Sequence, residues 1–176
     1  LDKNDSIMDY DAVYTTEPNL LIGVYTADCL GLLICDESTP LVCAIHSGWK
    51  GTAQNIVHKT MKHLLDKKLI HPQTVQIYFS PSIGYDSFEI GPEVKEAFMQ
   101  SGKEIGLDYS DLFKPGKEDR WFADHQAMNL RVLASLGIPK ENIHPTETDT
   151  KTTDTAFSFR RDGKATGEHF TYGWID

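Results

Sequence analysis

The sequence predicts an α+β fold in which mixed β-sheets are covered by helices. Short apolar runs of strand length lie between polar or proline-containing turns, at residues 20–26, 30–35, 41–45 and 75–79. Longer segments repeat apolar residues at steps of three and four, as amphipathic helices do, near residues 53–65 and 124–136. The 176 residues contain no internal repeat and no linker, so we expect a single domain over residues 1–176.

The composition argues against several classes of partner. A net charge of −9 disfavours binding to a nucleic-acid backbone, which needs a basic face. No apolar stretch approaches the length of a membrane span. The three cysteines are an odd number without the spacing of a disulfide scaffold, and Cys35 and Cys43 lie within apolar runs, as reduced core residues would. We therefore expect a cytoplasmic protein with neither nucleic-acid nor membrane partners.

The first predicted strands lead to a cysteine and a histidine. Residues 11–16 and 20–26 are expected to form strands, the second leading into Cys29. The next two apolar runs should form a hairpin about the turn near Ser38. Cys29 stands just before the first run of this hairpin and His46 just after the second. The hairpin would therefore place the thiol and the imidazole at the same end, facing each other.

A cysteine that faces a histidine has three interpretations. A thiolate and a neutral imidazole are good zinc ligands. The same groups can also act as a nucleophile and its base. The third interpretation is a buried cysteine that only packs beside the histidine. Gly48 and Gly51 favour the first two, because they follow His46 just before a helix and allow a ligand to approach the backbone closely.

The middle of the chain alternates helical and extended segments. A helix is expected to begin at Gly51 or Thr52 and to carry His58 and His63 on its solvated face. After the strand at residues 75–79, Pro81 and Gly84 mark a loop over residues 80–87. Pro92 suits the first turn of a helix that runs to about residue 100. The polar residues 102–120 are expected to form a surface connection.

The last third of the chain begins with a helix at residues 124–136, where His125 is expected to be a surface or capping residue. Residues 142–144 should form a short strand, and residues 147–155 a loop or an edge strand. Arg160 and Arg161 are expected to lie on a strand, so that their side chains point to opposite faces and only one of them reaches a site. An arginine in that place would suit phosphate. The final strand is expected at residues 170–175.

Several motifs together resemble the laccase-domain family. The first two are Thr26-Ala27-Asp28-Cys29-Leu30 and His46-Ser47-Gly48-Trp49-Lys50-Gly51-Thr52. Further matches follow in order along nearly the whole chain, at Ser80-Pro81-Ser82-Ile83-Gly84, Phe88-Glu89-Ile90-Gly91-Pro92-Glu93-Val94, and Phe157-Ser158-Phe159-Arg160-Arg161-Asp162-Gly163 with Thr166-Gly167. Members of this family were earlier described as multicopper polyphenol oxidases and are understood to be zinc-dependent purine nucleoside phosphorylases that also deaminate adenosine.

The resemblance implies a fold of the cytotoxic necrotising factor-like cysteine hydrolase type and a zinc enzyme. Its expected reaction cleaves adenosine, inosine or methylthioadenosine with phosphate, releasing the base and ribose 1-phosphate, and adenosine deamination is the second expected activity. Cys29 and His46 are the expected catalytic residues and zinc ligands. The expected substrate-binding residues are Asp28, Lys50, Arg160 and Arg161.

Two of these residues carry further expectations. Asp28 could orient His46, as carboxylates do for metal-bound imidazoles, or it could simply be a turn or capping carboxylate. Lys50 stands where the family commonly has arginine, so it keeps the charge but lacks the planar guanidinium. Both alternatives for Asp28 remain open from the sequence.

Three other functions compete with this expectation. The first is a cysteine hydrolase or deamidase with Cys29 as nucleophile and His46 as base. The second is a non-catalytic chain with an incomplete metal site. The weakest is a copper oxidase, because multicopper centres use His-x-His pairs and none of the seven histidines forms one.

The sequence also leads to a prediction about the metal. A catalytic zinc site has three protein ligands, and the family takes its third from a histidine upstream of the Asp-Ala segment. No histidine precedes Cys29 and the first residue is Leu1, so we expect the upstream segment to be missing. The 176-residue chain should therefore show low zinc occupancy by elemental analysis and little phosphorylase activity, and a longer chain carrying the upstream segment should recover both. Undiminished adenosine turnover by the 176-residue chain would instead favour Cys29 as a nucleophile.

Overall fold

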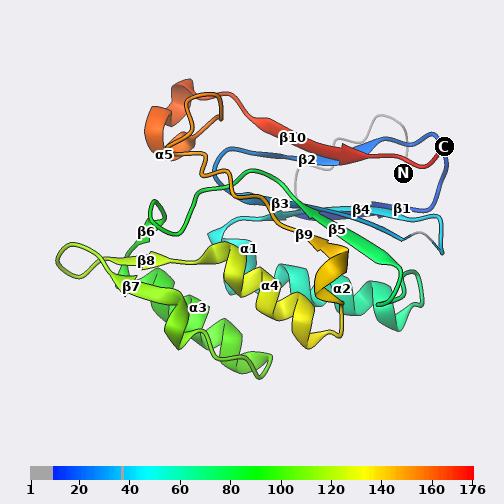
Figure 1. The fold of residues 1–176 in the computed structure, drawn as a ribbon, viewed down its shortest axis with the longest axis horizontal. Coiled ribbons are helices and arrows are strands. Elements are labelled where there is room, and N and C mark those ends of the chain that lie inside the picture. Colours follow the sequence, from blue (N-terminus) through cyan, green and yellow to red (C-terminus); the bar gives the residue numbers. More distant parts are fainter. Residues whose placement is uncertain (1–9, 37) are drawn as a thin grey trace.

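The computed structural model describes residues 10–36 and 38–176. Its elements form three layers (Figure 1). A central five-stranded sheet has the helices α1 (Trp49–Ala53), α2 (Ile56–Asp66) and α4 (His125–Ser135) on one face. A ribbon of two strands, β2 (Ile22–Thr26) and β10 (His169–Gly173), lies on the other face. This is the α+β architecture that the sequence predicts, with mixed sheets covered by helices.

The central sheet has the strand order β1-β4-β3-β5-β9, formed by β1 (Ala12–Thr15), β4 (Val42–Ser47), β3 (Leu30–Asp36), β5 (Val75–Phe79) and β9 (Ile143–His144). Only the β5–β9 pair is parallel. The predicted hairpin is confirmed, because β3 pairs antiparallel with β4 in a register that sets Leu30 opposite Ser47 and Gly31 opposite His46.

The helices over the sheet are α1 (Trp49–Ala53), α2 (Ile56–Asp66) and α4 (His125–Ser135). The expectation of one helix starting at Gly51 or Thr52 is wrong, because the helix starts at Trp49 and breaks after Ala53. Asn55 causes the break, since it adopts a left-handed conformation with φ of 58°. Its side-chain amide donates a hydrogen bond to the carbonyl of Ser101 (3.0 Å). No helix in the described residues is long and apolar enough to cross a membrane.

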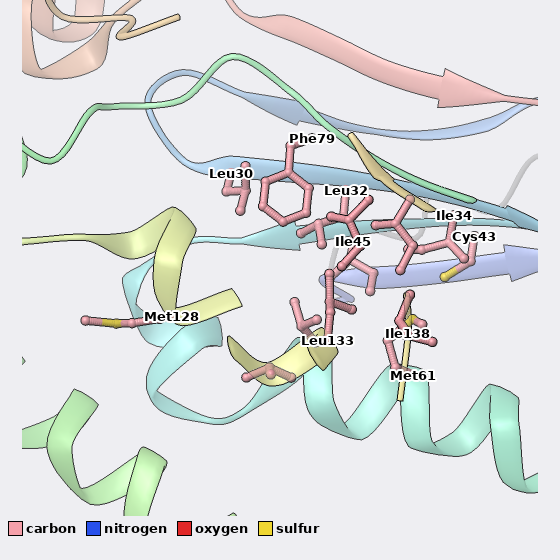
Figure 2. Packing of buried hydrophobic residues seen from close by; sticks show 14 of the residues in the cluster. Leu30, Leu32, Ile34, Cys43, Ile45, Met61, Phe79, Met128, Leu133 and Ile138 are labelled. Atoms are coloured by element: carbon pink, nitrogen blue, oxygen red, sulfur yellow. The ribbon is translucent and has the colours of Figure 1, made fainter. Parts of the chain in front are cut away.

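The core lies between the central sheet and the helices (Figure 2). Alternate residues of β3 point into it, because side chains of a strand alternate between the two faces of the sheet. These are Leu30, Leu32 and Ile34, and none of them is exposed. Met61 of α2 and Leu133 of α4 meet them from the helix layer.

A second, smaller sheet lies beside the core and joins β6 (Glu89–Ile90), β8 (Trp121–Ala123) and β7 (Phe113–Pro115). The helix α3 (Pro92–Glu104) runs four residues past the predicted end at residue 100, and a 3₁₀ turn follows at Ser110–Leu112. Residues 102–120 are therefore more than a surface connection, because they contribute Tyr109, Leu112 and Phe113 to the core. The ring of Tyr109 packs where a side chain on Gly102 would lie, 2.8 Å from the position of a Cβ atom.

The C-terminal part differs most from expectation. The predicted strand that carries the two arginines is wrong, because residues 159–162 form the short helix α5 (Phe159–Asp162). Two side chains fix its first turn: Ser158 Oγ accepts a hydrogen bond from the amide of Arg161 (3.2 Å) and Asp28 Oδ2 one from the amide of Arg160 (2.6 Å). The remaining 3₁₀ turns are Lys140–Asn142 and Gly163–Ala165.

The outer face of the β2–β10 ribbon carries a row of exposed aromatic side chains. Tyr25 stacks on Phe170 across the two strands, with ring centroids 4.4 Å apart. Tyr172 continues the row at 5.0 Å from Phe170, and Trp174 follows at 6.1 Å from Tyr172. Such pairs stabilise a ribbon that has no further strand on either side among the described residues.

The packing of α2 predicts unequal effects of two neighbouring substitutions. Met61→Ala should lower the free energy of unfolding by roughly 2–5 kcal/mol, because it leaves a cavity under the sheet. Lys62→Ala, on the exposed face of the same helix, should change it by less than about 0.5 kcal/mol. Urea denaturation of both variants tests this. Equal losses would show that the helix does not present this face to the core.

Candidate active site

Cys29 and His46 meet at the end of the β3–β4 hairpin, as the sequence predicts. Cys29 stands just before β3, and His46 is the last but one residue of β4. Both side chains lie against Gly48, where a Cβ atom would come within 3.0 Å of Cys29 Sγ and 3.3 Å of His46 Cε1. Gly48 therefore leaves the space in which the thiol and the imidazole face each other.

The environment of His46 favours its protonated form. A hydrogen bond with the Cys29 side chain raises the pKa of His46, burial opposes this shift, and a hydrogen bond to Asp11 raises the pKa further, to about 9. Asp11 Oδ1 accepts that bond from His46 Nδ1 at 2.7 Å. Because Nδ1 is engaged by Asp11, Nε2 is the nitrogen left for the thiol or for a metal ion.

The carboxylate that orients His46 is thus Asp11, and the suggestion that Asp28 does so is wrong. Asp28 is buried, with φ of 82°, and both of its oxygens have other partners. Oδ1 accepts a hydrogen bond from Thr150 Oγ1 (2.6 Å), and Oδ2 accepts one from the amide of Arg160 (2.6 Å). Asp28 therefore acts as the turn and capping carboxylate that was its alternative interpretation.

A cavity of about 350 Å³ opens beside Cys29, and we call it the first cavity. Three aromatic side chains line it, from Trp49 of α1, Phe88 and Phe159 of α5. Its polar lining includes Asp28, His125 and Arg160. A concave site with aromatic walls and a few polar groups is typical of the binding of small, flat ligands.

His125 is the lining residue that the sequence expectation missed. It was expected at the surface, yet only 3% of it is exposed. Its Nε2 is hydrogen-bonded to Thr52 Oγ1 (2.6 Å), and its ring packs near Phe88 and Phe98, at centroid distances of 5.8 and 6.4 Å. Burial lowers the pKa of His125 to about 4, so the ring is neutral at pH 7.

The helical spacing of the sequence indicates that His125 faces inward. His125 stands three residues before Met128 and seven before Val132, both of which are buried, so it lies on the same face of α4. The capping role belongs to its neighbour Asp124, whose Oδ1 accepts a hydrogen bond from the amide of Ala127 (2.9 Å). A histidine in phase with a buried stripe is therefore better read as an inward-facing residue than as a cap.

The three predicted cationic residues lie in different surroundings. Arg160 lines the first cavity and donates from Nη1 to the carbonyl of Glu89 (3.0 Å). Arg161 instead donates to backbone carbonyls, including those of Thr150 (2.9 Å) and Ala156 (2.7 Å). Lys50 is exposed and lies over the ring of Trp49, with its Nζ 5.7 Å from the centroid. Arg160 thus lines the first cavity and Arg161 does not, although the two residues lie in one helix rather than on opposite faces of a strand.

Cys29 and His46 are residue types that bind zinc, but a catalytic zinc site has three protein ligands and this pair supplies two. Cys29 and His46 offer a sulfur and an imidazole nitrogen, and Asp11 holds the imidazole as carboxylates do in zinc sites. Residues 10–36 and 38–176 contain no group of three or more His, Cys, Asp or Glu side chains that could hold a metal ion. Zinc binding by Cys29 and His46 therefore stays a prediction.

Comparison with known proteins places these features in a family. The family model described as multi-copper polyphenol oxidoreductase laccase matches residues 1–176. A purine nucleoside phosphorylase, YfiH of Shigella flexneri, is 32% identical over 166 residues, which cover 94% of this chain and 63% of that protein. A purine nucleoside phosphorylase of Clostridium acetobutylicum is 31% identical over 176 residues, with coverage of 97% and 69%. An adenosine deaminase from an unknown prokaryotic organism is 31% identical over 163 residues, with coverage of 92% and 60%.

Solved structures show the same fold. A hypothetical protein YfiH of Bacillus licheniformis superposes with a TM-score of 0.85 and is 26% identical, and the match covers 94% of this chain and 61% of that one. A Neisseria meningitidis protein superposes with a TM-score of 0.80 at 31% identity, covering 96% and 65%. The chain thus spans about three fifths to two thirds of the length of these proteins.

The burial of His125 predicts a pH dependence of stability. Its pKa is about 4 in the folded protein against an ordinary 6.5, so below pH 6.5 the unfolded state binds more protons. The free energy of unfolding should therefore fall by about 3 kcal/mol as the pH is lowered from about 6.5 to 4, because the proton binds His125 more readily in the unfolded chain. His125→Gln should show a flatter pH profile over this range in urea denaturation. His71→Gln, which removes an exposed histidine, should keep the wild-type profile, and equal profiles for all three proteins would contradict the burial argument.

Proposed function

The chain belongs to the multi-copper polyphenol oxidoreductase laccase family, and on that premise we propose that it contributes the active site of a purine nucleoside phosphorylase that also deaminates adenosine. The observation that carries this proposal is the first cavity, in which aromatic walls stand directly beside the paired Cys29 and His46. The relatives named as purine nucleoside phosphorylases and as an adenosine deaminase support the same substrate class.

The first cavity would hold the purine. Its three aromatic side chains, Trp49, Phe88 and Phe159, offer flat surfaces on which a base can stack. The neutral ring of His125, which also lines the first cavity, would offer a polar contact to the edge of a purine. The ribose would then point towards Cys29 and His46. Aromatic stacking with a small number of polar contacts suits a purine better than a flexible apolar ligand.

Phosphorolysis exchanges one bond at the sugar for another. A phosphate oxygen forms a bond to C1′ while the bond from C1′ to the base nitrogen breaks. The electron pair of that bond stays on the base nitrogen, which takes up a proton. In the deamination reaction, water adds at C6 of adenosine and ammonia leaves. Both reactions need an oxygen nucleophile held beside a bound purine nucleoside.

Cys29 and His46 are the residues that would hold a zinc ion, through Sγ and Nε2, together with a third ligand. When bound there, zinc would polarise an oxygen and activate the nucleophile. Asp11 keeps the His46 ring in one orientation through the hydrogen bond to Nδ1. Asp28 holds the first turn of α5, and thereby positions Phe159 and Arg160 in the lining of the first cavity.

A second candidate function is a cysteine hydrolase, and one observation favours it. The Cys29 thiol, the His46 imidazole and the Asp11 carboxylate form a hydrogen-bonded series, which is the arrangement of a nucleophile, its base and the group that orients the base. This chemistry needs no metal. Metal dependence therefore separates the two candidates.

The test is nucleoside turnover, together with zinc content, of the full-length protein. Cys29→Ala and His46→Ala should each lower zinc content and abolish the release of free base from adenosine and inosine, because each removes a proposed ligand. Cys35→Ala, which changes a cysteine outside the first cavity, should retain both. Release of base should require phosphate and should stop when a chelator removes the metal. Full zinc content in both ligand variants, or turnover that survives the chelator, would overturn the zinc assignment and favour the thiol nucleophile.

A further inference from the structure

Three hydrogen-bonded side chains lead from the end of β4 to the first cavity. Ser47 Oγ lies 2.9 Å from Thr52 Oγ1, and Thr52 Oγ1 lies 2.6 Å from His125 Nε2. Ser47 is the last residue of β4, Thr52 belongs to α1, and His125 is the first residue of α4. All three residues are buried, and His125 lines the first cavity. The series of hydrogen bonds therefore ends at the proposed purine site.

Ser47 sets the direction of these hydrogen bonds. Its side chain is fully buried, and Thr52 Oγ1 is its one side-chain hydrogen-bond partner among the described residues. If Ser47 only accepted, its own hydroxyl proton would be buried without an acceptor, which is costly. Ser47 therefore donates to Thr52. The hydroxyl proton of Thr52 has the same need, and His125 Nε2 is the acceptor that remains for it.

The direction of the series determines where the proton of His125 lies. Burial lowers the pKa of His125 to about 4, so the ring is neutral at pH 7 and carries a single proton. Because Nε2 accepts from Thr52, that proton must be on Nδ1. His125 is therefore a hydrogen-bond donor through Nδ1.

The Nδ1 atom opens onto the first cavity. Thr26 Oγ1 is the one buried side-chain oxygen or nitrogen without a partner among the described residues. His125 Nδ1 has no partner within the chain either, so it must retain accessible surface, and the cavity is the space that His125 lines. The rings of Phe88 and Phe98 pack near the imidazole and hold its orientation. The first cavity thus contains a fixed donor.

We propose that His125 is a specificity-determining residue that donates a hydrogen bond from Nδ1 to N7 of the purine. This inference rests on the proposed function, because it assigns a contact to the purine of that reaction. Adenosine and inosine differ at N1 and C6, whereas N3 and N7 are acceptors in both. N7 lies further from the ribose than N3 and is the more open of the two. A donor to N7 accommodates both nucleosides.

The same hydrogen bond would assist the release of the base. When the bond from C1′ to the base nitrogen breaks, its electron pair stays on the base, and part of the negative charge reaches N7. A fixed donor stabilises charge that develops in this way. Ser47 and Thr52 are positioning residues, because they hold the proton on Nδ1 while neither belongs to the lining of the first cavity.

The position of the proton can be measured without a ligand. Heteronuclear NMR of the histidine ring nitrogens, on the full-length protein at pH 7, should show His125 protonated at Nδ1 and bare at Nε2. The signals are assigned by their loss in His125→Phe. Ser47→Ala removes the group that sets the direction, so the form protonated at Nε2 should appear beside the first. A wild-type proton on Nε2 would overturn the donor role of His125.

Calorimetric titration measures the contact to N7. The ligands are inosine, 7-deazainosine and 3-deazainosine, in a buffer without phosphate so that phosphorolysis cannot consume them. The proteins are the full-length wild type, His125→Phe and His71→Phe. Phenylalanine keeps a flat ring beside Phe88 and Phe98 but offers no donor. His71→Phe is the matched control, since His71 is exposed and outside the lining of the first cavity.

Wild-type protein should bind 7-deazainosine on the order of tenfold more weakly than inosine, as expected for the loss of one hydrogen bond. It should bind 3-deazainosine as tightly as inosine. His125→Phe should weaken the binding of inosine by a similar factor and should leave the binding of 7-deazainosine unchanged. His71→Phe should match the wild type with all three ligands.

The possible failures are distinct. Equal binding of inosine and 7-deazainosine by the wild type would overturn the contact to N7. The same loss with 7-deazainosine in the wild type and in His125→Phe would overturn it too, because the loss would not depend on His125. No binding of inosine by the wild type would overturn the proposed function and the N7 contact with it, whereas the proton position found by NMR would still stand.

Discussion

The register of the β3–β4 hairpin is the constraint on which the candidate site depends. With Gly31 opposite His46, the residue before β3 and the end of β4 come to the same edge of the sheet. A shift of one residue would turn every side chain of a strand to the other face. That shift would also expose Leu30, Leu32 and Ile34, which carry the core against α2 and α4. The burial of the core thus fixes the register of the hairpin, and the register in turn fixes where Cys29 and His46 lie.

Asp28 joins the other parts of the site to this hairpin. Its carboxylate connects the turn after β2 with Thr150 and with the first turn of α5, segments more than a hundred residues further along the chain. Hydrogen bonds to a charged group are among the stronger ones in proteins. Through this single side chain, the part of the first cavity that α5 lines is held to the strand ends that carry Cys29 and His46. Asp28 therefore contributes to the site by placing α5 rather than by touching the imidazole.

Much of this arrangement could be predicted from the sequence, because local pattern controls it. The strand β5, the helix α4 and the Cys29–His46 pair all follow from apolar periodicity and turn residues. The remainder depends on contacts between distant segments. Asp11 meets His46 only because β1 pairs with β4, and α5 is capped by the distant Asp28 in addition to its neighbour Ser158. The inward direction of His125 was missed because a single polar residue near a helix start resembles a cap until its phase with Met128 is considered.

The parts of the chain around the site differ in the number of strands that support them. Cys29 and His46 stand at the ends of strands in a five-stranded sheet, whereas the turn before Cys29 follows Thr26, the last residue of a ribbon of only two strands. Elements with few neighbouring strands open locally at a lower free energy than a core sheet does. The aromatic row from Tyr25 to Trp174 offsets part of this difference from the outside. Amide protons of β2 and β10 should accordingly exchange with solvent before those of β3. The ribbon should therefore open locally while Cys29 and His46 keep their place at the ends of β3 and β4.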